Sequence, residues 1–192
     1  AALRGLAVYN DPARGNCAAC HPSARGSDGS FPLFTDFSYD AIGVPRNPAL
    51  ARNADPADFD LGLCTRTGGD LLPRRELCGA FKVPTLRNVA RRGSLFHNGA
   101  FSSLREALRF YASRDTDPGR WYPRRPDGSV DRFNDMPPAL RANVKERLPP
   151  HMVPSTIEAL DALPPPEAAH PYREAASERS RTLRDELLVA LA

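Results

Sequence analysis

Two cysteines and a histidine near the start of the chain have the spacing of a c-type haem attachment motif. Cys17, Cys20 and His21 form the pattern Cys-x-x-Cys-His within GNCAACHPSARG. In this pattern the thiols form thioethers to the haem vinyl groups, and the adjacent histidine reaches the iron from the same side. Zinc is the competing interpretation, but Cys64 and Cys78 are spaced too widely to form a second Cys-x-x-Cys unit. We therefore expect one covalently bound c-type haem.

The second axial ligand of the iron is not fixed by spacing. The candidates are His97, Tyr111, Met136, His151, Met152 and His170. A methionine would raise the reduction potential and suit electron transfer, whereas a tyrosinate is anionic and favours the oxidised iron. Spacing alone favours Tyr111 as an ordinary core tyrosine with a bonded hydroxyl, and Met136, in the loop FNDMPPAL, can also fill a gap in a core. Both therefore stay open as ligands.

Two helices are predicted near these residues. Residues 3–10 have apolar side chains at helical spacing, and Asp11-Pro12 ends the pattern just before the haem motif. Ser103 and Glu106 form a capping box that begins a second helix. Its predicted core face consists of Leu104, Ala107, Leu108 and Tyr111. Residues 22–60 are rich in Gly, Pro, Ser, Asp and Asn, which predicts loops.

The end of the chain differs in pattern from the rest. We expect a haem domain over residues 1–143 and a divergent tail over 144–192. A short helix is predicted at 139–148, and an amphipathic helix at about 172–191. The fold class is therefore predicted as mostly α, with long loops and a helical C-terminal tail.

Composition and charge exclude several classes of protein. The chain has 192 residues, of which 41% are hydrophobic, and its net charge is only +3. Its arginines are interleaved with acids, so we expect no nucleic-acid partner. No apolar run approaches the roughly 20 residues of a membrane span. The chain starts at Ala1 without a signal peptide, so we expect a mature periplasmic protein, because thioether-bound haem and disulfides suit an oxidising compartment.

Four stretches resemble the bacterial di-haem cytochrome c peroxidase family, and most closely its MauG-type branch. They are GNCAACHPSARG, FDLGLC, FKVPTLRNVA and FHNGAFSSLREALRFYASRDTDPGRWYP, and the match covers about residues 3–135. Members of this family have two cytochrome-c-like, mostly helical domains with one haem each. The resemblance implies that this chain is the second, C-terminal domain.

The resemblance also implies roles for single residues. The MauG-type branch has a tyrosine, and the peroxidases a methionine, at the position of Tyr111, so the resemblance favours Tyr111 over Met136 as the ligand opposite His21. Arg87 lies in a segment that lines the haem and could neutralise a propionate, although a surface arginine is equally consistent. His97 occupies a signature position near the haem, although a structural histidine is equally consistent.

Further implications concern cysteines and calcium. Cys64 and Cys78 match a cysteine pair of close relatives, which implies a disulfide. The family binds calcium between its two domains, partly through carbonyls just before the FH motif. Here that segment is RRGS, residues 91–94, in place of Thr-x-Pro, which argues against calcium.

Two functions follow as hypotheses. In the first, the chain is the electron-reservoir half, with a His/Tyr-ligated haem, of a di-haem peroxidase or MauG-like oxidase. The peroxide-binding haem then lies in another domain or chain, and a periplasmic electron donor or protein substrate is a further partner. In the alternative, the chain is a mono-haem electron-transfer cytochrome subunit with no catalytic activity of its own.

Overall fold

The computed structural model describes residues 2–145. These residues divide into two compact units. The first unit contains residues 2–36 and 84–92, and the second contains residues 37–83 and 93–145. The predicted tail helix and the ligand candidates His151, Met152 and His170 lie outside the described residues, and so does most of the predicted tail.

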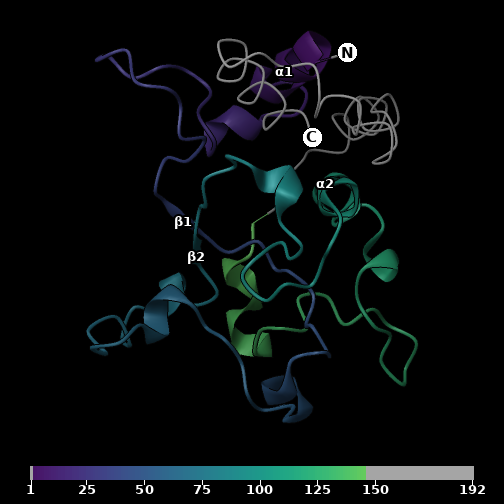
Figure 1. The fold of residues 1–192 in the computed structure, drawn as a ribbon. Helices are drawn as coiled ribbons and strands as arrows, with labels where there is room; N and C mark the ends of the chain where they lie inside the picture. Colours follow the sequence, from purple (N-terminus) through teal and green to yellow (C-terminus); the bar gives the residue numbers. More distant parts are fainter. Residues whose placement is uncertain (1, 146–192) are drawn as a thin grey trace. The chain divides into compact units, whose positions relative to one another are not determined.

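The first unit begins with helix α1, Ala2–Asn10, which is purple in Figure 1. The helix confirms the prediction for residues 3–10. The chain then turns back tightly, since the N–H of Gly15 donates to the Val8 carbonyl at 3.1 Å. A Cβ atom at Gly15 would lie 2.6 Å from that carbonyl oxygen, so this approach requires glycine. This tight turn places the haem motif directly after α1.

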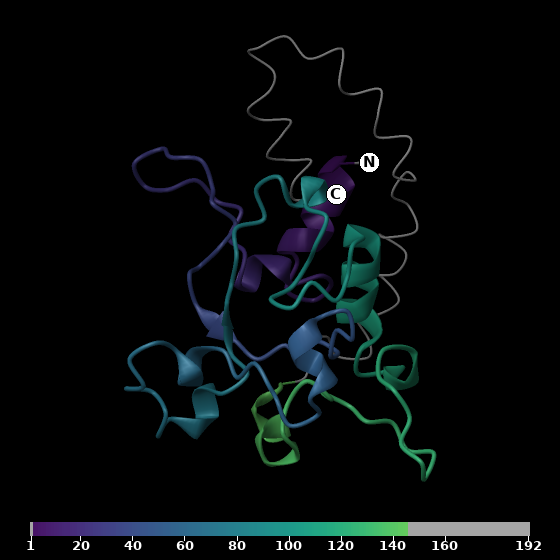
Figure 2. The same cartoon turned by 60° about the horizontal axis from the view of Figure 1, so that its bottom comes forward.

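The second unit contains helix α2, Leu104–Ser113, which Figure 2 shows along its length. The Ser103 side chain accepts a hydrogen bond from the Glu106 N–H at 3.4 Å, which confirms the predicted cap. Strand β1, Tyr39–Asp40, pairs antiparallel with β2, Phe81–Lys82, with Tyr39 opposite Lys82. Short 3₁₀ turns and long loops make up most of the remaining described chain, so the predicted mostly α character is not evident in residues 2–145.

The predicted α-helix at 139–148 is replaced by a 3₁₀ helix, Pro138–Asn143. Tertiary contacts account for the difference. The Asn143 side-chain amide donates to the carbonyls of Arg75, at 2.8 Å, and Cys78, at 3.0 Å. These bonds hold the turn against another segment, and the backbone leaves the helical region at Val144, where ψ is 121°.

A disulfide joins Cys64 and Cys78 in the core of the second unit, with Cα atoms 4.8 Å apart. The residues packed around it are Ala41, Met136, Leu140 and Val144. On helix α2, Phe110 has no exposed surface. Among residues 2–145 no helix has the length and apolar character needed to cross a membrane.

Candidate haem site

The two cysteines of the haem motif lie in a tight turn of the first unit. Asn16 precedes the turn in the left-handed conformation, with φ 51°, and Cys17 begins a one-turn 3₁₀ helix. The N–H of His21 donates to the Cys17 carbonyl at 2.9 Å, which closes the turn. Cys17 and Cys20 are both half-buried in this turn, and they are the two residues that would form thioether bonds to a haem. Burial raises the pKa of Cys17 to about 11.

His21 is held through its ring and through its backbone. The Nδ1 atom lies 2.8 Å from the carbonyl oxygen of Phe34, and because a carbonyl can only accept, Nδ1 carries the hydrogen. The hydroxyl of Tyr9 donates to the His21 carbonyl. Burial lowers the pKa of His21, which favours the neutral ring. Nε2 is therefore left with its lone pair, the arrangement that an axial haem ligand requires.

Arg87 adjoins the loop that fixes His21. Its Nη1 donates to the Pro32 carbonyl at 3.2 Å, two residues before Phe34. The Thr85 hydroxyl donates to the Leu33 carbonyl at 2.6 Å, which ties the PTLRN segment to the same loop. Within the first unit, Arg87 is thus tied to the loop whose Phe34 carbonyl holds the His21 ring.

His97 lies in the second unit, between an aromatic ring and a carboxylate. Its ring stacks on Phe81 with centroids 3.5 Å apart, and its Nε2 lies 3.8 Å from Oδ2 of Asp135. Asp135 is buried and accepts hydrogen bonds from Asn98 at 3.0 Å and Arg46 at 3.4 Å. His97 is therefore held in a fixed orientation by this unit.

Tyr111 lies on α2, in a row of side chains that the rest of the described chain buries only in part. Leu104, Leu108 and Tyr111 are spaced by four and three residues and are all half-buried. The predicted core face was only partly correct, because the most buried residue of the helix is Phe110. The ring of Tyr111 contacts Phe96 at a centroid distance of 5.6 Å and Phe110 at 6.2 Å.

Met136 is placed differently, inside the core of the second unit. Only 4% of it is exposed, and it packs with the disulfide. A Cβ atom at Gly79 would lie 2.8 Å from the Met136 sulfur, so the thioether is packed directly on the glycine backbone. This is the gap-filling environment typical of a core methionine.

Several contributors to the site were not identified from the sequence. The Phe34 carbonyl holds His21, and the Asp135 carboxylate lies beside His97, and both are distant in sequence from the histidine that they contact. Neither residue type is typical of a haem motif. Among residues 2–145, no group of three His, Cys, Asp or Glu side chains comes together as a metal site.

Known proteins resemble the chain in both sequence and structure. No family model matches it. It is 38% identical over 120 residues to methylamine utilization protein MauG of Paracoccus denitrificans, covering 60% of this chain and 28% of that protein. It is 30% identical over 142 residues to cytochrome-c peroxidase IdrP1 of Denitromonas iodatirespirans, covering 62% and 33%. The crystal structure of the diheme peroxidase BthA from Burkholderia thailandensis matches with a TM-score of 0.64 and 39% identity, covering 84% and 42%.

The chain is therefore similar to proteins of the di-haem peroxidase type, and haem is the cofactor that these similarities imply. The chain is a homologue of MauG and of the cytochrome-c peroxidases, which confirms the resemblance seen in its motifs. It spans between 28% and 42% of the lengths of these three proteins.

Proposed function

We propose that this chain is the C-terminal, electron-reservoir domain of a di-haem peroxidase or MauG-like oxidase. Cys17 and Cys20 bind one c-type haem covalently, and His21 and Tyr111 are its axial ligands. The haem that reacts with peroxide lies in another domain or chain. Because both axial positions are filled here, the role of this chain is to store and deliver an electron.

The observation that carries this proposal is the contrast between Tyr111 and Met136. An axial ligand has to present its donor atom where a porphyrin can lie. Tyr111 stands on a half-buried apolar stripe with Leu104 and Leu108, which suits the cover of a haem face. The Met136 sulfur is packed against Gly79 and the disulfide, and it would have to leave the core to reach an iron.

The surrounding residues support the same assignment. The Phe34 carbonyl orients the His21 ring and fixes its tautomer. Arg87, which lies in the same unit as the haem motif, would offset the charge of a haem propionate, and His97 keeps the loop before α2 in place. Haem with an anionic tyrosinate ligand supplies a low-potential redox centre that favours the oxidised state.

The electron count of the peroxide reaction proposed for the whole protein is consistent with this role. Reduction of hydrogen peroxide to two waters consumes two electrons and two protons. One electron comes from this domain and one from the haem that binds peroxide. The electrons are restored by a donor protein or, as the MauG resemblance implies, by an aromatic residue of a protein substrate. Thioether-bound haem and a disulfide suit an oxidising compartment, which supports the periplasm as the proposed location.

Two matched variants test the assignment. Tyr111→Phe removes the phenolate and should change the haem absorption spectrum and raise its reduction potential. Met136→Leu conserves volume, costs less than about 1.5 kcal/mol, and should leave both unchanged. An unchanged spectrum in Tyr111→Phe, together with a changed one in Met136→Leu, would overturn the proposal in favour of a methionine-ligated electron-transfer cytochrome.

A further inference from the structure

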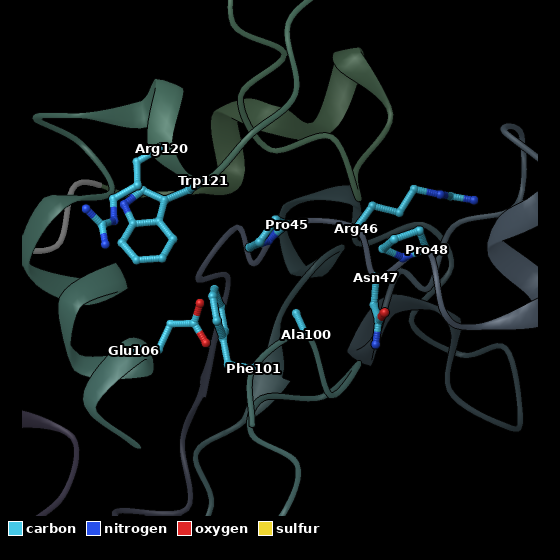
Figure 3. Close-up of a pocket in the computed structure, with 9 residues that line it drawn as sticks. All are labelled: Pro45, Arg46, Asn47, Pro48, Ala100, Phe101, Glu106, Arg120 and Trp121. Carbon is cyan, nitrogen blue, oxygen red and sulfur yellow. The ribbon is translucent and has the colours of Figure 1, made fainter. Parts of the chain in front are cut away.

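A tryptophan lines a surface cavity in the second unit. Trp121 is the single tryptophan of the chain and is half-buried. The cavity, of about 420 Å³, is also lined by Phe101, Glu106, Arg120 and Pro45. In Figure 3 the indole of Trp121 and the carboxylate of Glu106 lie on the same side of the cavity, while the side chain of Arg46 extends away from them. The cavity falls within the size range of small-molecule sites.

Packed aromatic rings connect this cavity to Tyr111. The ring of Trp121 lies 5.6 Å from that of Phe110, which lies 6.2 Å from that of Tyr111. A second series runs from Trp121 through Phe101 and Phe96, with steps of 5.7, 5.4 and 5.6 Å. These are ordinary contact distances for aromatic pairs. Since Phe110 is fully buried, the shorter series runs through packed protein.

The chemistry of the rings determines which of them can exchange an electron. Phenylalanine rings are not oxidised under biological conditions, whereas indoles and phenols are. Tyr122 is also close, at 6.5 Å from Phe110, but its hydroxyl donates to the Gly43 carbonyl, which is no base. Burial also raises the pKa of Tyr122, so its proton is hard to remove on oxidation.

Oxidation of Trp121 does not require the loss of a proton. An indole can lose an electron and keep its N–H proton as a radical cation. The Trp121 Nε1–H donates to the Ser113 hydroxyl at 3.0 Å, which retains that proton. The Glu106 carboxylate on the cavity wall favours a positive charge on the indole, and the Arg120 guanidinium, 5.2 Å from the ring, opposes it. Trp121 is therefore the oxidisable residue at the cavity end of the series.

We propose that Trp121 is a one-electron relay between the cavity and the haem at Tyr111. The proposal rests on the proposed function, because it needs Tyr111 to adjoin the haem. When the haem of this domain is already oxidised and peroxide takes two electrons and two protons to form two waters, one of those electrons leaves Trp121, and peroxide is the oxidant. The indole becomes a radical cation, and a small one-electron reductant that reaches the cavity returns the electron.

Pulse radiolysis tests the relay without peroxide. Azide radicals oxidise tryptophan in preference to tyrosine, so in the haem-containing chain with its haem reduced they produce the Trp121 radical. We expect this radical to decay at a rate independent of protein concentration, in step with oxidation of the haem absorption band. In Trp121→Phe that haem oxidation should slow by about tenfold or more. Tyr122→Phe is the matched control and should keep the fast phase.

Two results would overturn the relay. The first is a Trp121 radical whose decay rate in the unmodified chain rises in proportion to protein concentration. This measurement does not depend on the folding of any variant. The other is equally fast haem oxidation in Trp121→Phe. The proposed function fails separately, through an unchanged haem spectrum in Tyr111→Phe, so the two failures are distinguishable.

Discussion

The Nδ1 atom of His21 lies 2.8 Å from the carbonyl oxygen of Phe34, thirteen residues further along the chain. Phe34 has a φ of 51°, in the left-handed region, and its buried ring packs edge-on against Tyr9 with centroids 6.2 Å apart. The protein thus orients the histidine through a backbone atom. An orientation held by such a second partner is what makes a ligand ring ready for its metal.

Tyr9→Phe should lower the stability of the first unit. The variant keeps the ring packing on Phe34 but removes the donor to the His21 carbonyl. Loss of a buried hydrogen-bond partner costs about 1–3 kcal/mol. Chemical denaturation measures the change, and Tyr39→Phe, at a tyrosine that is 48% exposed, is the control expected to have no effect. Equal stabilities of the two variants would contradict the role given to Tyr9.

Arg114→Met should destabilise the second unit strongly. Arg114 has no exposed surface, and its guanidinium donates to the Asp115 carboxylate and to the carbonyls of Ile42 and Lys145. Removing one partner of a buried ion pair costs about 3–5 kcal/mol. Arg74→Met removes an exposed ion pair with Glu76 and should cost at most about 1 kcal/mol. A thermal or denaturant midpoint that falls equally in both variants would refute this assignment.

Asp131 should make stability depend on pH in the acid range. Burial acts to raise the pKa of Asp131, but hydrogen bonds from Arg141, at 2.6 Å, and Arg125 outweigh it and hold the pKa below its usual 3.8. The folded state therefore gains stability from this group above pH 3.8 and loses it as pH falls through the lower, folded value.

Unfolding curves of Asp131→Asn measured against pH check this directly. The variant should be less stable than the unmodified chain near neutral pH. The difference should shrink once the pH falls below 3.8. A difference that is constant across this range would show that the ionised carboxylate contributes nothing.

Local signals predicted some elements and failed for others. The capping box at Ser103 predicted the start of α2 because the cap is a contact between near neighbours. The helix expected at 139–148 is a 3₁₀ turn, because Asn143 bonds the carbonyls of Arg75 and Cys78, more than sixty residues away. Contacts between residues so far apart in the chain leave no pattern in the local sequence.

The site shows the same division. The order Cys-x-x-Cys-His identifies the haem motif, since the chemistry needs those residue types at that spacing. The Phe34 carbonyl could not have been found, because every residue has a backbone acceptor. The core face of α2 was misjudged at Phe110, where a cluster of aromatic rings from other segments decides burial. The choice of Tyr111 over Met136 depended on the family resemblance.

The most direct test of the central claim is the resonance Raman spectrum of the oxidised, haem-containing chain. Excitation into a tyrosinate-to-iron charge-transfer band enhances the vibrations of a bound phenolate. We predict that these vibrations are present and are lost in Tyr111→Phe. A spectrum without them, accompanied by the absorption band of a methionine-ligated iron, would contradict the account.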